Sequence, residues 1–364
     1  MTDSETTIEV EHLYKRFGGV EAVNNISFEV RRGEIIGFLG PNGAGKSTTM
    51  RILTGYVPAT SGIVRICGYS VAGEPTQVKR RIGYMPENNP LPEDLRVREY
   101  LAWRGRLKEL GGKRLRERLE TALEVCDLHR SQNRIIGKLS KGYRQRVGVA
   151  DAILAEPDVI IMDEPTIGLD PHQILMIRDL IASLRGRMSV LISSHILPEI
   201  EMTCDRVIII NQGRIVASGT PSQLRNEFLL RATYELEIKG DIREAQQTLA
   251  AFTPKEQVEH ALERPDRDGF YRINVQLRSD RHYGEDILSA VNTNPRLRIR
   301  ALRRREASLE EVFLAATRRS WDTVTPLAGR DAARDATASV PSADAPRPAA
   351  APAEPLPLSP DRPS

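Results

Sequence analysis

The stretch Gly40-Pro-Asn-Gly-Ala-Gly-Lys46-Ser47 decides how the first part of this chain folds. It has the spacing G-x-x-x-x-G-K-[ST], in which glycines let the backbone curl and point successive N–H groups at an anion. An apolar run, Ile35–Leu39, precedes it, and a helical run, Thr48–Leu53, follows it. A strand that leads through such a loop into a helix predicts a phosphate-binding loop rather than an ordinary glycine turn.

Two side chains at the end of this loop suit a nucleotide. We expect the Lys46 ammonium to neutralise the β- and γ-phosphates of ATP, and the Ser47 hydroxyl to ligate Mg²⁺. The nucleotide-binding residues predicted for the segment are Gly40, Pro41, Asn42, Gly43, Ala44, Gly45, Lys46, Ser47 and Thr48.

A second motif ends the apolar run Val159–Met162 with two carboxylates, Asp163 and Glu164. Buried charges need partners, so folding alone explains such an ending poorly. We expect Asp163 to act at Mg²⁺ and Glu164 to polarise the attacking water. An apolar run that ends in Asp-Glu is commonplace by itself, and it gains meaning from the phosphate-binding loop upstream.

The segment Leu139-Ser-Lys-Gly-Tyr-Arg-Gln-Arg146 lies shortly before the two carboxylates and looks like a variant of the LSGGQ-x-[QR]-R signature of the ABC ATPases. With this segment, the chain resembles the family of ABC transporter ATP-binding subunits over nearly all of its first region. Ser140 can cap the following helix, whose free N–H groups would face a phosphate, although a plain Ser-capped amphipathic helix would look the same. The resemblance implies contacts with ATP held by a second subunit from Ser140, Lys141, Gly142 and Tyr143.

Further matches to the family follow along the chain. Gly168-Leu169-Asp170 resembles the D-loop, which crosses the dimer interface in the family, so Asp170 is expected near the nucleotide. His195 lies where the family has the histidine that contacts the γ-phosphate. Phe17 resembles the aromatic residue that stacks on adenine, or is a phenylalanine of the core or of a strand edge.

Three positions depart from the usual pattern of the family. Glu87, in Gly83-Tyr-Met-Pro-Glu87, stands where the family usually has Gln. Its carboxylate can meet Mg²⁺ or water, but it adds negative charge beside the γ-phosphate. Lys141 replaces the first Gly of the signature and Tyr143 replaces its Gln. These forms, and the ending Ser308–Phe313, resemble the ABC-2 type exporters, a branch of the family.

The chain divides into three regions that differ in composition and in hydrophobic pattern. Residues 1–228 alternate short β-branched runs with glycine turns and helical stretches, which predicts an α/β fold; the resemblance makes it a P-loop NTPase with a RecA-like core and a β-rich N-terminal part. A helical subdomain is inserted at about residues 88–155. Residues 229–319 predict a small α+β domain with strands at Tyr234–Ile238 and Tyr271–Leu277, and helices at Ile242–Phe252 and Leu309–Arg318. Residues 320–364 are rich in Pro and Ala and are predicted to be a disordered tail.

Composition excludes several classes of protein. The net charge of +3 does not point to nucleic acid or to an anionic membrane. The three cysteines, Cys67, Cys126 and Cys204, lie far apart and are expected to be small buried hydrophobes in a reducing cytoplasm. No signal peptide is expected at the start of the chain, and no apolar run reaches the roughly 20 residues of a membrane-spanning helix.

The resemblance implies how such a chain works. Two cassettes close head to tail around two ATP molecules, so each site is completed by a second copy of the chain or by a related cassette. Closure is passed to transmembrane permease subunits through about Asn88 to Arg98, at the cytoplasmic face of the membrane. The catalytic residues are predicted to be Glu164, His195 and Glu87, and the metal ligands Ser47, Asp163 and Glu87.

Other functions within the ABC family predict other sequence features. A translation factor of the family would carry two cassettes, and a DNA-repair or chromosome ATPase would insert a long heptad coiled coil between the two main motifs; neither feature is present. An importer, or an ATPase of a membrane complex that transports nothing, remains an alternative to the exporter. The arginines between Arg298 and Arg305 suggest either an anionic ligand or the solvated face of a strand.

Overall fold

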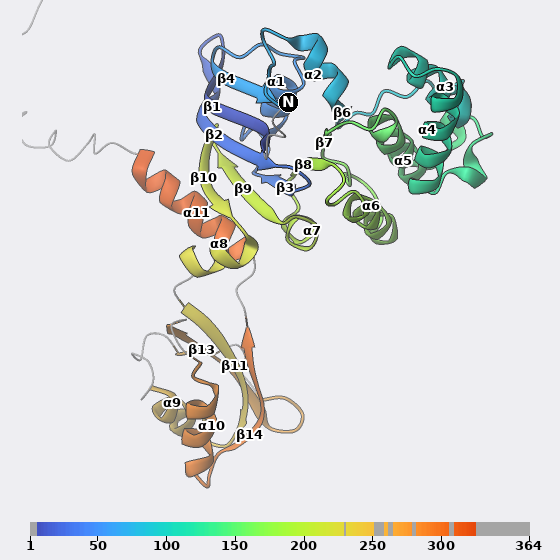
Figure 1. Ribbon diagram of the computed structural model, residues 1–364. Coiled ribbons are helices and arrows are strands. Elements are labelled where there is room, and N and C mark those ends of the chain that lie inside the picture. The colour runs from blue at the N-terminus through green and yellow to red at the C-terminus, as the bar shows by residue number, and fades with distance from the viewer. Residues whose placement is uncertain are drawn as a thin grey trace, which may run out of the picture. The chain divides into compact units, whose positions relative to one another are not determined.

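The computed structural model describes residues 6–228, 231–250, 258–260, 265–278, 282–305 and 309–324. Within these ranges the strands form three sheets, two in the first region of the chain and one in the second. Figure 1 shows the elements along the chain.

The central sheet has the strand order β10-β9-β3-β8-β7-β6. Neighbouring strands are parallel, except that the edge strand β10 runs antiparallel to β9. In chain order its strands are β3 (Ile35–Leu39), β6 (Ile82–Met85), β7 (Val159–Asp163), β8 (Ser189–Ser194), β9 (Arg206–Asn211) and β10 (Arg214–Gly219).

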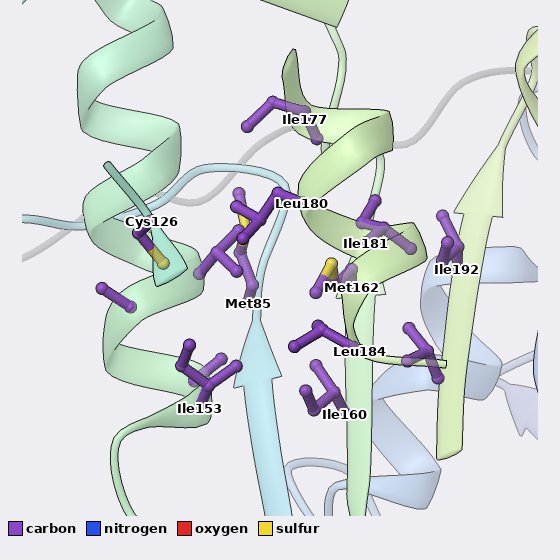
Figure 2. Packing of buried hydrophobic residues seen from close by; sticks show 14 of the residues in the cluster. Met85, Cys126, Ile153, Ile160, Met162, Ile177, Leu180, Ile181, Leu184 and Ile192 are labelled. Carbon is purple, nitrogen blue, oxygen red and sulfur yellow. The ribbon is translucent and has the colours of Figure 1, made fainter. Parts of the chain in front are cut away.

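The inner strands of this sheet are apolar without interruption because both of their faces are covered. On β7, Ile160 and Met162 belong to one buried cluster, whereas Val159 and Ile161 belong to another on the opposite face. Figure 2 shows the first of these faces, where Ile177, Leu180, Ile181 and Leu184 pack over Met85, Ile160, Met162 and Ile192. The two clusters hold the sheet rigidly between two layers.

The layer on the second face is an antiparallel sheet of order β2-β1-β4-β5. Helix α1 (Lys46–Leu53) contributes Met50, Ile52 and Leu53 to the same cluster. The strands are β1 (Thr6–Phe17), β2 (Val20–Arg31), β4 (Ser61–Ile66) and β5 (Tyr69–Ser70), and α2 (Pro75–Arg81) leads from them to β6.

A group of helices stands between β6 and β7 in the chain (Figure 1). Asp151, which is 7% exposed, ties two of them together because its carboxylate accepts hydrogen bonds from Arg104 Nε at 2.9 Å and from the Tyr100 hydroxyl at 3.1 Å. Burial lowers the pKa of Lys108, whose ammonium lies 3.3 Å from the same carboxylate. The helices are α3 (Val97–Leu107), α4 (Gly112–Val125) and α5 (Lys141–Ile153), with 3-10 turns at His129–Ser131 and Ile136–Lys138.

The remaining helices of the first region follow its strands. Helix α6 (Pro171–Ser183) follows β7, α7 (Leu197–Thr203) follows β8, and α8 (Pro221–Phe228) follows β10. The described residues contain no helix that is both long and apolar enough to cross a membrane.

The second region forms an antiparallel sheet of order β12-β13-β11-β14 with a cluster of its own. Tyr234, Leu236 and Ile238 alternate into this cluster from β11, as the sequence pattern predicts. The elements are β11 (Arg231–Lys239), α9 (Ile242–Ala250), β12 (Val258–His260), β13 (Phe270–Arg278), α10 (Gly284–Thr293) and β14 (Arg298–Arg305).

The last helix differs from its predicted place. Helix α11 (Leu309–Val324) was expected in the C-terminal domain, but Val312 and Ala316 belong to the buried cluster that also contains Leu224 of α8. The helix also includes residues 320–324, where the tail was predicted to begin. The rest of the tail, the end of the helix predicted at Ile242–Phe252, and Ser308 lie outside the described residues.

The predicted α/β P-loop fold is confirmed, including the strands at Ile35–Leu39 and Val159–Met162. Cys126 and Cys204 are buried free thiols as expected, whereas Cys67 is only half-buried. The arginines from Arg298 to Arg305 lie on the edge strand β14, where Arg300 pairs with Glu237 and Asp266. The domain boundaries remain a prediction.

Gly83→Ala tests how tightly α5 packs on β6. A Cβ at Gly83 would lie 2.2 Å from the Ala152 carbonyl oxygen, a backbone atom that cannot move aside. We expect the overpacked variant to lose about 1–3 kcal/mol of stability, measured as a lower midpoint of thermal unfolding. Gly19→Ala is the control, because a Cβ there meets no atom within 4 Å. Equal midpoints for the two variants would contradict this packing.

Candidate nucleotide site

The predicted site residues follow three neighbouring strands of the central sheet. The loop Gly40–Ser47 follows β3, Glu164 follows β7, and His195 follows β8. These strands are parallel, so their carboxyl ends meet at one edge of the sheet. Ligands of open α/β sheets bind at this edge.

The phosphate loop, Gly40–Ser47, needs its glycines. Gly45 has φ +105°, and a Cβ there would lie 2.5 Å from the Ala22 carbonyl oxygen. A Cβ at Gly40 would lie equally close to the Ile210 carbonyl oxygen, at 2.5 Å. The loop is thus pressed against its surroundings and opens onto the N-terminus of α1, where free N–H groups favour an anion.

Lys46, the first residue of α1, reaches back to the start of this loop. Its side chain is 7% exposed, and its ammonium donates a hydrogen bond to the Gly40 carbonyl at 2.7 Å. The ammonium also lies 3.4 Å from Glu164 Oε1. A buried cation held this way places its charge where phosphates bind at the helix N-terminus.

Asp163 joins the phosphate loop to the sheet. Its Oδ1 accepts hydrogen bonds from the Ser47 hydroxyl at 3.2 Å and from the Ser193 hydroxyl at 2.5 Å. The carboxyl is 2% exposed, and its charge adds to burial in raising the pKa of Tyr84 to about 12. Asp163 therefore links Ser47 of the phosphate loop to Ser193 of β8.

Glu164 is held in a strained conformation. Its φ is +50°, in the left-handed region that costs a non-glycine residue roughly 1–3 kcal/mol. Its backbone N–H donates to the Ser193 hydroxyl at 3.0 Å, which stabilises the turn. Its Oε2 lies 2.8 Å from His195 Nδ1, so its carboxylate lies between His195 and Lys46. Backbone strain of this kind is typical of functional sites.

These groups border a cavity of about 430 Å³. Of the predicted site residues, the cavity is lined by Pro41, Asn42, Gly43, Gly45, Lys46, Ser47, Thr48, Glu87, Glu164 and His195. Gly40 and Ala44 belong to the loop but do not line the cavity, because Ala44 is buried and the Gly40 carbonyl accepts from Lys46. Asp163 reaches the cavity only through Ser47.

The other predicted residues do not line this cavity. Phe17 ends β1 and is 49% exposed, with the Lys15 ammonium 4.7 Å from its ring centroid. Ser140 caps α5 through the Tyr143 N–H at 3.5 Å, and Asp170 caps α6 through the Gln173 N–H at 2.9 Å. Each cap satisfies one N–H in the first turn of its helix, and neither Ser140 nor Asp170 lines the cavity at the phosphate loop of the same chain.

Two segments predicted for the dimer interface lie side by side in one chain. The Lys141 ammonium is 2.3 Å from the point that a Cβ at Gly168 would occupy, so the two residues are in contact, and the φ of +68° at Gly168 favours glycine. Gly142 is packed in the same way against the side chain of Gln173 on α6. The signature segment, Leu139–Arg146, and the D-loop therefore form one continuous surface.

Several residues of the site were not predicted from the sequence. Ser193 holds the Asp163 carboxylate and the Glu164 backbone, but a serine at a strand end carries no recognisable signal. Ala22 and Ile167 also line the cavity. Ala22 comes from β2, in a different sheet, and only the three-dimensional structure shows that it is near.

Comparison with known proteins agrees with this geometry. Residues 23–167 match the family model described as ABC transporter. The Nod factor export ATP-binding protein I of Ralstonia nicotianae is 34% identical over 322 residues, which cover 87% of this chain and 95% of that protein. The chain belongs to the ABC transporter family.

Further relatives support the same assignment. A daunorubicin resistance ATP-binding protein of Streptomyces coeruleorubidus is 36% identical over 62% of this chain and 71% of its own length. The solved structure of an ATP-binding subunit of an ABC transporter has a TM-score of 0.57 at 33% identity, covering 61% of this chain and 93% of that one. A dimeric ATP-binding cassette bound to ADP and phosphate after hydrolysis has a TM-score of 0.54 at 25% identity, covering 58% of this chain and 98% of that one. The prediction of an ATP-binding, ATP-hydrolysing subunit that resembles the exporter branch is confirmed.

Ser193→Ala tests the hydrogen bonds that hold Asp163 and the backbone of Glu164. Losing this hydroxyl leaves Asp163 Oδ1 with only the bond from Ser47, at 3.2 Å, and the Glu164 N–H with only the Ser193 carbonyl, also at 3.2 Å. Loss of such supporting groups typically costs about 10- to 100-fold in activity. We expect kcat for ATP hydrolysis to fall by that factor while ATP still binds.

Ser189→Ala is the matched control at the other end of β8. Its hydroxyl is also buried and hydrogen-bonded, to Thr7 and to the Arg31 carbonyl, but it lies far from the cavity. It should lower the unfolding midpoint without lowering kcat. Equal losses of kcat in the two variants would show that Ser193 matters only for folding.

Proposed function

We propose that this chain hydrolyses ATP to power an exporter, with Glu164 as the general base. The observation that carries the proposal is the position of this carboxylate, buried at the edge of the nucleotide cavity between Lys46 and His195. A general base needs an environment that fixes both its geometry and its charge.

Each polar group at the cavity has a distinct task in this mechanism. Glu164 orients the attacking water and accepts its proton. Lys46 and the N–H groups of the phosphate loop bind the phosphates and stabilise the charge that develops on them. His195, 2.8 Å from Glu164, holds that carboxylate in place and offers its second ring nitrogen to the γ-phosphate.

The donor atoms present fit Mg²⁺. This ion prefers oxygen ligands and is usually held by one or two protein groups together with phosphate oxygens. Ser47 Oγ and Asp163 Oδ1 lie 3.2 Å apart beside the cavity, and Glu87 lines it. Within the described ranges no three Asp, Glu, His or Cys side chains converge on a metal site. Phosphate oxygens and water would supply the remaining ligands. When bound, the ion would neutralise charge on the phosphates.

We propose that a second copy of the chain completes the site. The face formed by the signature segment and the D-loop carries two capped helix N-termini, at Ser140 and Asp170, that do not reach the cavity of their own chain. In a head-to-tail pair this face would contact the γ-phosphate of the partner's ATP. Phe17 would stack on adenine after a side-chain movement, since its ring is exposed.

The permease is proposed to dock beside the segment that follows Glu87. A cavity of about 690 Å³ lies there, bordered by Tyr56, Lys79, Arg104 and Lys108. An apolar groove next to it is lined by Pro90, Leu91, Pro92, Leu95, Tyr100, Trp103 and Arg104. We call these two hollows together the docking groove. Docking there would hold the chain at the cytoplasmic face of the membrane.

A short segment connects this groove to the nucleotide. Glu87 lines the nucleotide cavity, and Asn89, two residues later, donates a hydrogen bond to the Arg144 carbonyl on α5 at 3.1 Å. The Asn89 side chain also lies over Gly148, 2.1 Å from the point that a Cβ there would occupy. Movement of Glu87 on hydrolysis would therefore pass to the helical group and to whatever occupies the groove. An importer, or a membrane complex that transports nothing, would use the same connection; the exporting relatives favour export.

Glu164→Gln tests the assigned base. The amide keeps the shape of the side chain but cannot accept a proton, so we expect kcat to fall roughly 10²- to 10⁴-fold. ATP binding, measured by titration with a fluorescent analogue, should stay within a small factor of wild type. Glu201→Gln, the same change on the outer side of α7 where Glu201 pairs with Arg225, should leave kcat unchanged. A Glu164→Gln protein that turns over normally would refute the assignment.

Trp103→Ala tests the docking groove. Its ring is 48% exposed and lines the apolar part of the groove, as hot-spot aromatic residues at interfaces do. We expect a smaller fraction of the variant to sediment with native membranes of its own organism, at unchanged ATPase activity of the isolated subunit. Leu107→Ala, on the same helix but outside the groove and 58% exposed, is the control. Unaltered sedimentation of Trp103→Ala would place the docking surface elsewhere.

A further inference from the structure

A buried carboxyl group that the mechanism above does not use lies next to the site. Glu199 belongs to the short helix α7, which begins two residues after His195. It is 9% exposed, although burying a carboxylate is costly unless it is paired. Its neighbour in the helix, Ile200, packs into the hydrophobic cluster, so the backbone here is fixed by packing.

Glu199 has one hydrogen-bond partner and one oxygen without any. Its Oε2 accepts a hydrogen bond from the hydroxyl of Thr166. Thr166 is buried and stands in the turn between β7 and α6, two residues after Glu164. Oε1 of Glu199 and Nε of Arg178 on α6 are both buried and without a hydrogen-bond partner among the described residues.

The charges around Glu199 place it in the electrostatic field of the site. Burial raises its pKa, and the hydrogen bond from Thr166 opposes this effect. The charge of Glu164 raises the pKa further, whereas His195 and Arg178 lower it. Glu199 is thus close enough to interact with both groups proposed to act on ATP, and with the helix that follows the D-loop.

Hydrogen bonds therefore connect the segment after β7 to the segment that carries His195, both before and after His195 in the sequence. Before His195, Ser193 accepts a hydrogen bond from the Glu164 N–H. After His195, Glu199 accepts one from Thr166. The contact between the His195 ring and Glu164, at 2.8 Å, lies between these two links.

We propose that Glu199 is a positioning residue, which holds the segment carrying His195 against the turn Glu164–Asp170 so that His195 and the D-loop move together. The inference rests on the proposed roles of Glu164 and His195 in hydrolysis. Contact of His195 with a γ-phosphate then shifts α7, and the link from Glu199 to Thr166 passes that shift to Gly168–Asp170, the part of the turn that would meet a second copy of the chain.

A double-mutant cycle with Glu199→Met, which removes the acceptor oxygen at similar side-chain length, and Thr166→Val tests this link. Because both changes break the same link between buried groups, each should lower kcat by about tenfold, with KM for ATP changed by less than about twofold. The double variant should be no slower than the slower single variant. Thr166→Ser keeps the hydroxyl and should therefore keep most of the wild-type activity. A residue that served only for packing would not need the hydroxyl.

Controls separate positioning from folding and from the proposed function. Glu201→Met makes the same chemical change two residues away on α7 and should match wild type in kcat. Thermal unfolding midpoints measured for all variants identify any that lose activity by unfolding; Thr166→Ser and Glu199→Asp serve as milder substitutes. Additive losses in the double variant, or wild-type kcat in both single variants, would overturn the inference. If Glu164→Gln also kept its activity, the proposed function itself would fail, and the two failures are therefore distinguishable.

Discussion

The Glu164 carboxylate is buried between the ammonium of Lys46 and the ring of His195, and most of the architecture around it serves to hold these groups together. The arrangement is costly, because it combines a buried charge with a backbone in the left-handed region. It persists because the turn is anchored by Ser193 below it and because Lys46 is fixed by the phosphate loop. Strain stored in this way fixes the site before the nucleotide binds, which is what electrostatic catalysis requires.

The parallel sheet makes this convergence possible. Layers on both of its faces bury β3, β7 and β8 completely, so their carboxyl ends are fixed relative to one another. A site assembled from three strand ends needs such rigidity, since misplacing a catalytic group by about 1 Å can cost about 100-fold in rate. The segment from Glu87 to Asn89 connects the cavity directly to the packing of the helical group. In the proposed mechanism, chemistry at the cavity and movement of the helices are joined through these few residues.

Much of the fold and part of the site could be predicted from the sequence. The loop Gly40–Ser47 and the run ending in Asp163 and Glu164 have local signals, because glycine spacing and an apolar run that ends in carboxylates are visible in the sequence. Ser193, Thr166 and Glu199 carry no such signal, since their importance depends on which strands become neighbours. The packing of α11 could not be predicted from the sequence either. Its apolar spacing predicts a helix but does not say which buried cluster contains Val312 and Ala316. Local patterns predict elements and loops, whereas contacts between distant segments need the structure.

In the proposed mechanism, one chain holds only part of the hydrolytic site and a second copy supplies the rest. The molecular mass of the Glu164→Gln protein by analytical ultracentrifugation, with and without Mg-ATP, tests this directly. We expect a monomer that becomes a dimer only when ATP is present, because ATP stays unhydrolysed between two copies. A variant that binds ATP but remains a monomer at the same concentration would contradict the self-pairing proposed for the signature segment and the D-loop.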